Sequence, residues 1–256
     1  MLSFDTFPAT HAADKPPLII VHSLFGSGRN WGAIARRLAD RREVWTVDQR
    51  NHGSSPHAPT NTYPDMAADL AEVAQAAGGR VDLLGHSMGG KAAMQLALTQ
   101  PDLIGKLVVA DIAPVAYRHD NTQHIHAMRS LDLTGVTSRG DADRRLSDHE
   151  SDPALRAFFL QSLDLKSDPP RWRLNLDVLE AEMPTIVGWP NTPGTFEHPT
   201  LFLSGEHSRY VLPEHRPAIL KQFPKARFAR INDAGHWLHA EQPRAFEETV
   251  RVFLDA

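Results

Sequence analysis

The sequence contains no cysteine. A chain without cysteine forms no disulfides, offers no thiolate metal ligands and has no cysteine nucleophile, which is typical of cytoplasmic proteins. Apolar runs are short, and none approaches the roughly 20 residues that a transmembrane helix needs. The first eight residues also lack the basic and then apolar order of a secretory signal. We therefore expect a cytoplasmic protein without a membrane partner.

The sequence also lacks an excess of either sign of charge, since its formal net charge is only −4. Without a basic excess or a long run of like charges, we expect no nucleic-acid partner. The hydrophobic share of 41% and the charged share of 23% are those of a globular protein, and 256 residues can bury a substantial core.

Short apolar runs alternate with helical patterns along most of the chain. The runs are typical of strands in a parallel sheet that is covered on both faces, and they occupy residues 18–21, 44–47, 81–84, 106–110, 199–204 and 226–231. Residues 2–7 alternate like an edge strand. The intervening patterns predict helices over residues 31–39, 66–77, 88–100, 213–223 and 243–254. Such alternation favours a mostly parallel sheet flanked by helices, with the loops at the strands' carboxyl ends gathered along one edge.

The alternation stops between residues 115 and 197, where only helical patterns occur. They cover Thr122–Leu131, Ala142–Leu146, Pro153–Leu163 and Arg171–Met183. Asp152-Pro153 and Asp168-Pro169 are predicted helix starts, because aspartate caps a helix and proline suits its first turn. We expect a helical cap over residues 115–197, and a core of residues 1–114 and 198–256. The apolar residues of the cap are expected to pack within it rather than to contact substrate. They are Phe158, Phe159, Leu160, Leu174, Leu176 and Leu179.

The strongest functional motif follows the apolar run Val81–Leu84. Gly85, Ser87 and Gly89 come next, and an alanine-rich helical pattern begins. Strand, tight turn and helix in this order form the context of a G-x-S-x-G nucleophile elbow. Side chains at positions 85 and 89 would collide with the strained turn that exposes the serine. We therefore predict that Ser87 is a nucleophile rather than part of an ordinary loop.

A serine hydroxyl needs a neighbouring base to remove its proton. His236 follows the last predicted strand, and a parallel sheet would bring that loop to the edge where Ser87 lies. In the chain order serine, acid, histidine, the base comes last. We predict His236 as the base, and His239 is the nearest alternative.

The acid that orients the histidine has several candidates. In many proteins of this class an aspartate follows the strand before the last, but that position here holds Ser208. Asp111 ends the strand directly after the elbow unit, so its carboxylate is within reach of the histidine loop. We predict Asp111 as the acid, with Glu206 second and Asp233 third. The alternative role of Asp111 is a turn residue before the cap.

Acyl transfer also needs two N–H donors for the oxyanion. The residue after the nucleophile, Met88, supplies one, and Leu24 in the loop after an early strand is predicted to supply the other. Tyr117, His207 and Trp237 are predicted to line the substrate pocket.

Other polar residues are interpreted as structural. His22, Arg50 and His52 are expected to organise the loops in which they lie. His124 and His126 would splay across a helix, so we expect no metal site there.

With these motifs, the chain resembles the α/β-hydrolase superfamily over its full length. More narrowly, it resembles the YbfF group of bacterial esterases, which is related to the ABHD11-type hydrolases. The matching segments are His22–Ser27, Asp48–Pro56, Gly85–Lys91, Val109–Tyr117, Trp172–Leu176, Ser208–Val211 and Gly235–His239. Ser23 stands where this group usually has glycine, beside the predicted oxyanion donor.

The resemblance implies an α/β-hydrolase fold whose cap follows the sixth strand and whose acid lies there too, at Asp111. It also implies a carboxylesterase- or thioesterase-type serine hydrolase that needs no cofactor and no metal, with a small acyl ester or thioester as substrate. Two alternatives remain open. The same residues could act on a C–C bond, lactone or peroxide, or the chain could be a non-catalytic ligand-binding member of the fold. The oligomeric state also remains open.

Overall fold

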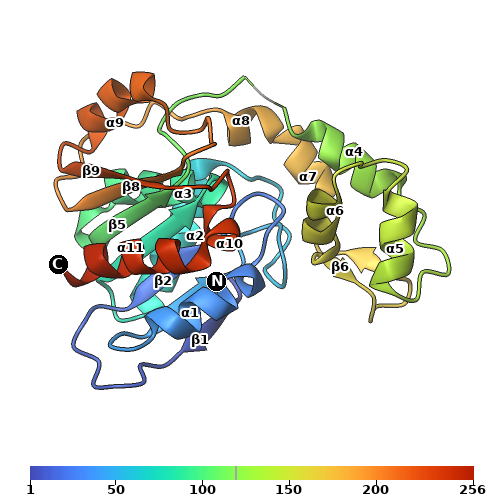
Figure 1. Cartoon of the computed structure of the whole chain (residues 1–256), viewed down its shortest axis with the longest axis horizontal. Coiled ribbons are helices and arrows are strands. Elements are labelled where there is room, and N and C mark those ends of the chain that lie inside the picture. Colours follow the sequence, from blue (N-terminus) through green and yellow to red (C-terminus); the bar gives the residue numbers. More distant parts are fainter. Residues whose placement is uncertain (119) are drawn as a thin grey trace.

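A seven-stranded sheet forms the centre of the computed structural model, which describes residues 1–118 and 120–256. Its strand order is β1-β3-β2-β4-β5-β8-β9 (Figure 1). The strands are β1 (Phe4–Phe7), β2 (Leu18–Val21), β3 (Val44–Val47), β4 (Val81–His86), β5 (Ile104–Ala110), β8 (Thr200–Gly205) and β9 (Ala226–Ile231). Only β1, the predicted edge strand, runs antiparallel to its neighbour. The predicted α/β-hydrolase architecture is confirmed.

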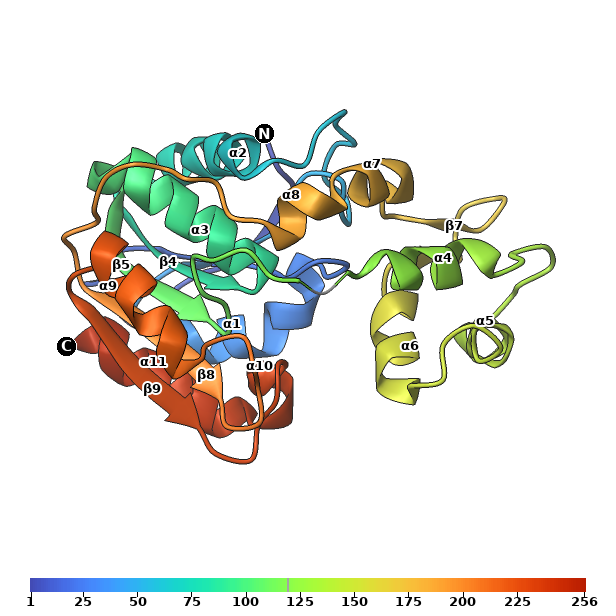
Figure 2. The ribbon, with the colours of Figure 1, turned by 90° about the horizontal axis from the view of Figure 1, so that it is seen from above.

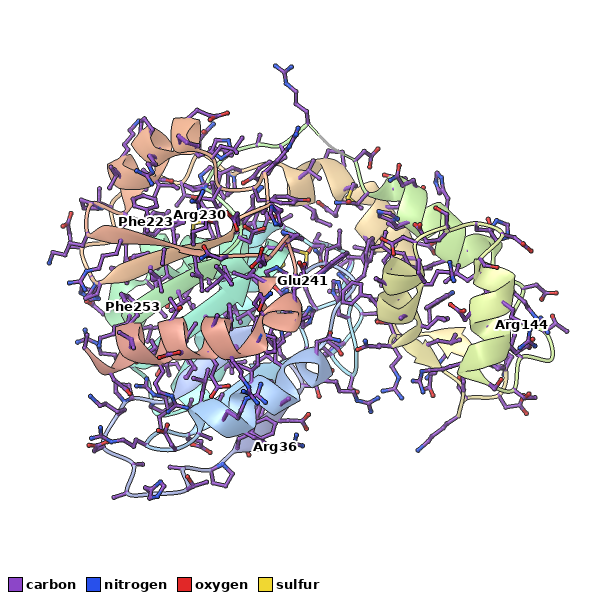
Figure 3. All side chains as sticks on the ribbon, viewed as in Figure 1. Arg36, Arg144, Phe223, Arg230, Glu241 and Phe253 are labelled. Atoms are coloured by element: carbon purple, nitrogen blue, oxygen red, sulfur yellow. The ribbon has the colours of Figure 1, made fainter. Side chains whose placement is uncertain are left out.

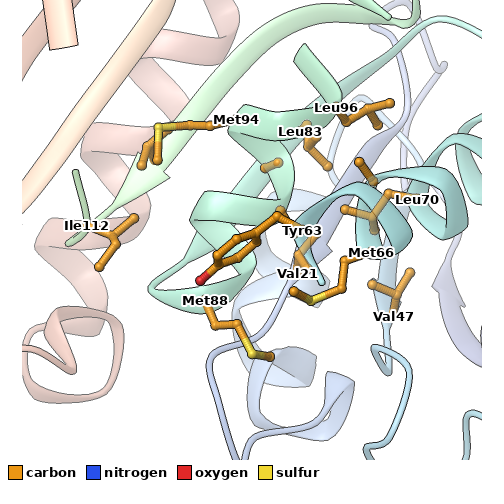
Figure 4. Close-up of a cluster of buried hydrophobic side chains, with 14 of the residues drawn as sticks. Val21, Val47, Tyr63, Met66, Leu70, Leu83, Met88, Met94, Leu96 and Ile112 are labelled. Atoms are coloured by element: carbon orange, nitrogen blue, oxygen red, sulfur yellow. The ribbon is translucent and has the colours of Figure 1, made fainter. Parts of the chain in front are cut away.

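Helices cover both faces of this sheet (Figure 2). Successive residues of β2 show why, because Ile19 packs with α2 and α3 on one face while Ile20 packs with α1 and α11 on the other. Figure 4 shows the first of these clusters. The helices are α1 (Gly32–Leu38), α2 (Tyr63–Ala76), α3 (Met88–Thr99), α9 (Arg216–Gln222), α10 (Leu238–Glu241) and α11 (Pro243–Asp255).

One predicted helix boundary differs at α2, which begins three residues before the predicted Met66. Thr62 has an extended backbone, and its side chain accepts a hydrogen bond from the Asp65 N–H. Pro64 occupies the first turn, where its missing N–H leaves no bond unmade. Thr62, the N-terminal capping residue of α2, therefore lies outside the apolar pattern from which the start of this helix was predicted.

Residues 115–197, called the insertion below, leave the sheet after β5 and return before β8. They contain α4 (Thr122–Ser130), α5 (Arg139–Leu146), α6 (Pro153–Leu160), α7 (Leu176–Ala181), α8 (Met183–Val187) and the two-stranded pair β6 (Leu163–Asp164) and β7 (Arg171–Trp172). Helices α4, α5 and α6 stand apart from the sheet in Figure 1. The preceding strand is the fifth of this chain, so the expected position after a sixth strand is corrected.

One predicted helix start in the insertion is confirmed and the other is wrong. Asp152 caps α6 by accepting a hydrogen bond from the Ala154 N–H. Asp168 and Pro169 instead lie between β6 and β7, and no helix begins there. The predicted helix over residues 171–183 is replaced by β7, α7 and α8 because Arg171 and Trp172 pair with Asp164 and Leu163.

Separate apolar clusters form on the two faces of the sheet and within the insertion. Phe223 and Phe253 belong to opposite faces, and Arg144 lies on the outer helix α5 of the insertion (Figure 3). Among the described residues, we find no helix with the length and apolar character required to cross a bilayer.

Candidate active site

Ser87 sits at the sharp turn between β4 and α3, with φ 53° and ψ −120°. This is a strained conformation for a residue with a side chain. A Cβ at Gly85 would lie 2.3 Å from the Gly89 carbonyl oxygen, and a Cβ at Gly89 would lie 2.5 Å from that of His22. The two glycines are therefore required by contact with backbone. They allow the turn to project the serine above the sheet edge.

His236 joins Ser87 to a buried carboxylate. Its Nδ1 lies 2.7 Å from Asp111 Oδ2, and its Nε2 lies 3.1 Å from Ser87 Oγ. An ionised carboxylate only accepts, so Nδ1–H is the donor to Asp111. The Nε2 lone pair then faces the serine hydroxyl, which is the arrangement a general base requires.

Asp111 is fully buried at the end of β5, and its positive φ of 52° turns its side chain toward the histidine loop. Its other hydrogen bonds come from the Gly205 N–H, at 3.2 Å, and from the Ser208 hydroxyl. Burial of an unpaired carboxylate would be unfavourable, but these donors satisfy both oxygens. The carboxylate is thereby held in one orientation.

The alternative residues lie elsewhere. Glu206 is exposed and accepts from the Asp233 N–H at 3.0 Å, and Asp233 is exposed too. His239 stacks on Trp31 with ring centroids 4.1 Å apart. Burial lowers the pKa of His239 to about 3, so this ring stays neutral at physiological pH. None of these three side chains contacts Ser87 in the structure's hydrogen-bond network.

Sequence reasoning assigned no role to three residues around this site. Ser208, at the position where an acid was first sought, donates to Asp111 and accepts from the Tyr210 N–H at 3.2 Å. The Tyr210 ring stacks on His236 with centroids 4.1 Å apart. His86 Nε2 lies 2.8 Å from the His236 carbonyl oxygen and donates to it. The signals were the segments Gly85–Lys91 and Ser208–Val211, which matched by resemblance.

A cavity of about 270 Å³ opens beside Ser87. The predicted oxyanion donors Leu24 and Met88 line it, as does Ser23. Tyr117 and Trp237, predicted as pocket residues, also line the cavity. His207 does not, and this prediction is wrong. Its N–H donates to the Ala234 carbonyl at 2.8 Å in the turn after β8, and its side chain is exposed.

The aromatic residues of α6 correct another expectation. Phe158 and Phe159 were expected to pack within the insertion, yet both line the cavity. Phe159 does both, because it is 1% exposed and its ring centroid lies 5.3 Å from that of His124 in the insertion. Leu160, Leu174 and Leu179 are buried in apolar clusters, as expected. The helical spacing of apolar residues in the sequence identified the apolar face of α6, but it did not show that this face borders the cavity.

The polar residues interpreted as structural do organise loops. His22 Nε2 accepts from the Gln49 N–H at 2.9 Å, and His52 Nε2 accepts from the Phe25 N–H at 3.2 Å. Burial lowers the pKa of His22 to about 4 and that of His52 to about 3, so both rings are neutral acceptors. Arg50 pairs with Asp69 at 2.6 Å.

The described residues contain one group with metal-ligand spacing, formed by Glu206, His207 and Asp233, whose ligand atoms lie within 4.8 Å of one another. All three are exposed, and none lines the cavity. His124 and His126 point to different partners, Glu150 and Glu180. The cavity beside Ser87 is therefore lined by groups suited to proton transfer and apolar contact.

Comparison with known proteins agrees with the fold. The family described as the alpha/beta hydrolase fold matches residues 16–243. The chain belongs to this family. It is 39% identical to Esterase YbfF of Escherichia coli (strain K12), over 96% of each chain. It is also 39% identical to the sn-1-specific diacylglycerol lipase ABHD11 of Danio rerio, over 99% of this chain and 82% of the relative.

A solved structure, a marine microorganism esterase, has 38% sequence identity to this chain. Its TM-score is 0.92, and the match covers 98% of both chains. The resemblance to the YbfF group is thereby confirmed, and the relatives are hydrolases by name.

Proposed function

We propose that this hydrolase-family chain is a serine esterase with Ser87 as nucleophile, His236 as general base and Asp111 as orienting acid. The observation that carries the proposal is the continuous hydrogen-bond chain from Asp111 through His236 to Ser87, at 2.7 and 3.1 Å, on the wall of a cavity. This arrangement makes the serine hydroxyl a nucleophile toward an acyl carbon.

In the proposed reaction, Ser87 Oγ attacks the acyl carbon while its proton passes to His236 Nε2. The N–H groups of Leu24 and Met88 donate to the oxyanion of the tetrahedral intermediate. As the intermediate collapses, His236 returns the proton to the leaving alcohol and an acyl-enzyme forms. Water then attacks with His236 as base, and the acid and free Ser87 are released.

Small acyl esters are the proposed substrates. The cavity volume of about 270 Å³ is just below the roughly 300–1,000 Å³ of sites that hold drug-sized ligands. Its lining is mostly apolar, which suits an acyl chain. The relatives carry the names esterase and diacylglycerol lipase, which supports an ester bond as the target. Acyl thioesters form a second proposed class, because thiolate leaves readily from the same intermediate.

We propose also that the insertion, residues 115–197, acts as a cap. It supplies cavity-lining residues from α6 and α8, namely Leu155, Phe158, Phe159, Ile186 and Val187. Exclusion of water by such a cover would strengthen the electrostatic interactions at the oxyanion. The cytoplasmic location expected from the sequence stays a prediction.

Labelling by a fluorophosphonate probe tests the nucleophile. We expect covalent modification of Ser87 in folded protein, and no labelling of S87A with its fold retained by circular dichroism. S147A is a matched control, because Ser147 lies at the end of α5 in the insertion and outside the cavity. Folded wild-type protein that is not labelled would disprove the proposal and favour a non-catalytic binding protein.

A substrate panel tests the reaction class. We expect hydrolysis of p-nitrophenyl acyl esters and, as the second class, acyl-CoA thioesters, both lost in S87A. If only lactones, peroxides or C–C substrates are turned over, the same residues serve a different reaction and the esterase assignment is wrong.

A further inference from the structure

Lys91 is a buried cation beside the proposed active site that the reaction above does not use. It lies one turn after Ser87 on α3, where its N–H donates to the Ser87 carbonyl at 3.1 Å. The residue is only 1% exposed, and it lines the cavity. Lysine is rarely buried to this extent without a specific set of partners.

The partners of this ammonium group lie in the insertion. Lys91 Nζ donates to the carbonyl oxygens of Val187, at 3.0 Å, and of Gly188, at 2.5 Å. The Val187 carbonyl also accepts from the Tyr117 N–H at 2.9 Å. Residue 117 lies near the start of the insertion, and residues 187–188 lie at the end of α8, its last helix. Lys91 therefore holds the end of α8, and through it residue 117, against the helix that carries the nucleophile.

Two tyrosine rings complete the surroundings of the ammonium group. Its Nζ lies 4.8 Å from the centroid of the Tyr117 ring and 5.7 Å from that of Tyr63, distances typical of cation–π attraction. The Tyr63 hydroxyl donates to the Ile186 carbonyl, and the Tyr117 hydroxyl donates to that of Tyr210. Tyr210 stacks on His236. Lys91, Tyr63 and Tyr117, called the cage below, thus contact the insertion and, through Tyr210, the proposed base.

This cage forms part of the cavity wall, because Tyr63, Lys91 and Tyr117 all line the cavity. Among the lining residues, Tyr63, Lys91 and Ile112 are at most 3% exposed, whereas Phe158 and Trp237 are only half-buried. In Figure 4, the Tyr63 hydroxyl points to the side of the cluster on which Ile112 lies. An acyl chain held beside Ser87 would lie against this part of the wall.

Resting on the proposed esterase function, we propose that Lys91 sets the acyl-chain length that the enzyme accepts. In this proposal the end of the acyl chain lies against Lys91, which also holds Val187 of the cavity wall in place through its hydrogen bond. Lys91 is a positioning and specificity-determining residue, and it takes no part in proton transfer. A long chain is rejected because its terminal methylenes would have to displace a hydrogen-bonded ammonium group without replacing its partners.

The experiment measures kcat and KM for p-nitrophenyl esters from acetate to dodecanoate, in wild type, K91A and K91M. We expect wild type to prefer short chains. In K91A, kcat/KM for octanoate relative to acetate should rise by about tenfold, because methylenes gain a newly opened apolar site. K91M, which fills the space but has no donor, should give a smaller rise. Because the ratio compares two substrates of the same variant, a general loss of kcat in that variant cancels from it.

Lys106 provides the matched control. Its Nζ also donates to a backbone carbonyl, that of Leu254 at 2.7 Å, but it lies on β5 outside the cavity. K106M should keep the wild-type chain-length profile. An unchanged profile in folded K91A would overturn the inference, and so would wild-type enzyme that hydrolyses dodecanoate as well as acetate. The test with wild-type enzyme remains valid even if K91A does not fold. If wild type hydrolyses none of the esters and resists the fluorophosphonate, the proposed function itself fails.

Discussion

At the scale of the residue, the environment of Asp111 explains why this carboxylate can orient a histidine. It receives hydrogen bonds from a backbone N–H, from the Ser208 hydroxyl and from His236 Nδ1. Glu206, only one residue past β8, faces solvent instead. The difference follows from the direction in which each strand end turns its side chain.

We predict that D111N loses activity by about 10⁴-fold in kcat, because an amide in this position favours the wrong imidazole tautomer. The measurement is steady-state ester hydrolysis, with circular dichroism to verify the fold. E206Q is the matched control and should remain active. Near-wild-type activity of D111N would reassign the acid.

Lys91 gives a second prediction at this scale, for alkaline pH. Burial lowers the pKa of its ammonium from 10.5 to about 7, whereas burial raises the pKa of the neighbouring Tyr63 and Tyr117 hydroxyls. Between pH 7 and 10.5 the unfolded chain therefore binds a proton at this lysine that the folded chain has released. Its contribution to the free energy of unfolding should rise with pH across that window and be constant below it.

The measurement is urea unfolding of wild type and K91M at pH 7 to 10. The stability of wild type relative to K91M should increase as the pH rises. Parallel pH dependence of the two proteins would show that Lys91 keeps its proton in the folded state.

At the scale of the element, the elbow depends on the close approach of α3 to the end of β2. A Cβ at Gly89 would come within 2.5 Å of the His22 carbonyl oxygen and 2.6 Å of that of Val21. Backbone atoms at these distances belong to a central strand and cannot move aside cheaply.

We therefore expect G89A to destabilise the protein by several kcal/mol, on the order of the larger overpacking effects, and to abolish activity by displacing Ser87. Thermal unfolding and probe labelling measure the two effects. In contrast, G140A in α5 has no atom within 4 Å of its added Cβ. It should be neutral or stabilise by up to about 1 kcal/mol through helix propensity. Equal melting temperatures for G89A and wild type would contradict this account of the elbow.

At the scale of the whole molecule, three buried histidines make the free energy of unfolding depend on pH. His22, His52 and His239 have pKa values lowered from 6.5 to about 4, 3 and 3, chiefly by burial. Below pH 6.5 the unfolded chain gains protons that the folded chain does not bind. Their contribution to stability is therefore complete above pH 6.5 and is lost as the pH falls toward 4.

We expect the free energy of unfolding in urea to fall as the pH is lowered from 7 to 4.5, with net proton uptake on unfolding. Calorimetry in two buffers of different ionisation enthalpy measures that uptake. H239Q should reduce the slope relative to wild type, since it removes one of the titrating groups. A stability that does not change between pH 7 and 5 would show that these rings are protonated in the folded state.

The sequence predicted the local features well because their causes are local. Gly85–Gly89 between an apolar run and a helical pattern defines the elbow by backbone sterics alone. The alternation of strands and helices indicated which loops share an edge, and hence that Ser87, Asp111 and His236 lie at the same edge. The predicted helix at Asp168 failed because a dipeptide signal was outweighed by the pairing of β6 with β7.

What the sequence by itself determined was the sheet, the elbow and the set of loops from which the site is built, since periodicity and turn geometry act over a few residues. Only the tertiary structure decided which side chains meet. It turned His207 to solvent, brought Phe158 and Phe159 to the cavity, and placed Lys91 against the end of α8 in the insertion. These contacts join residues far apart in the chain, and their geometry depends on how whole elements pack.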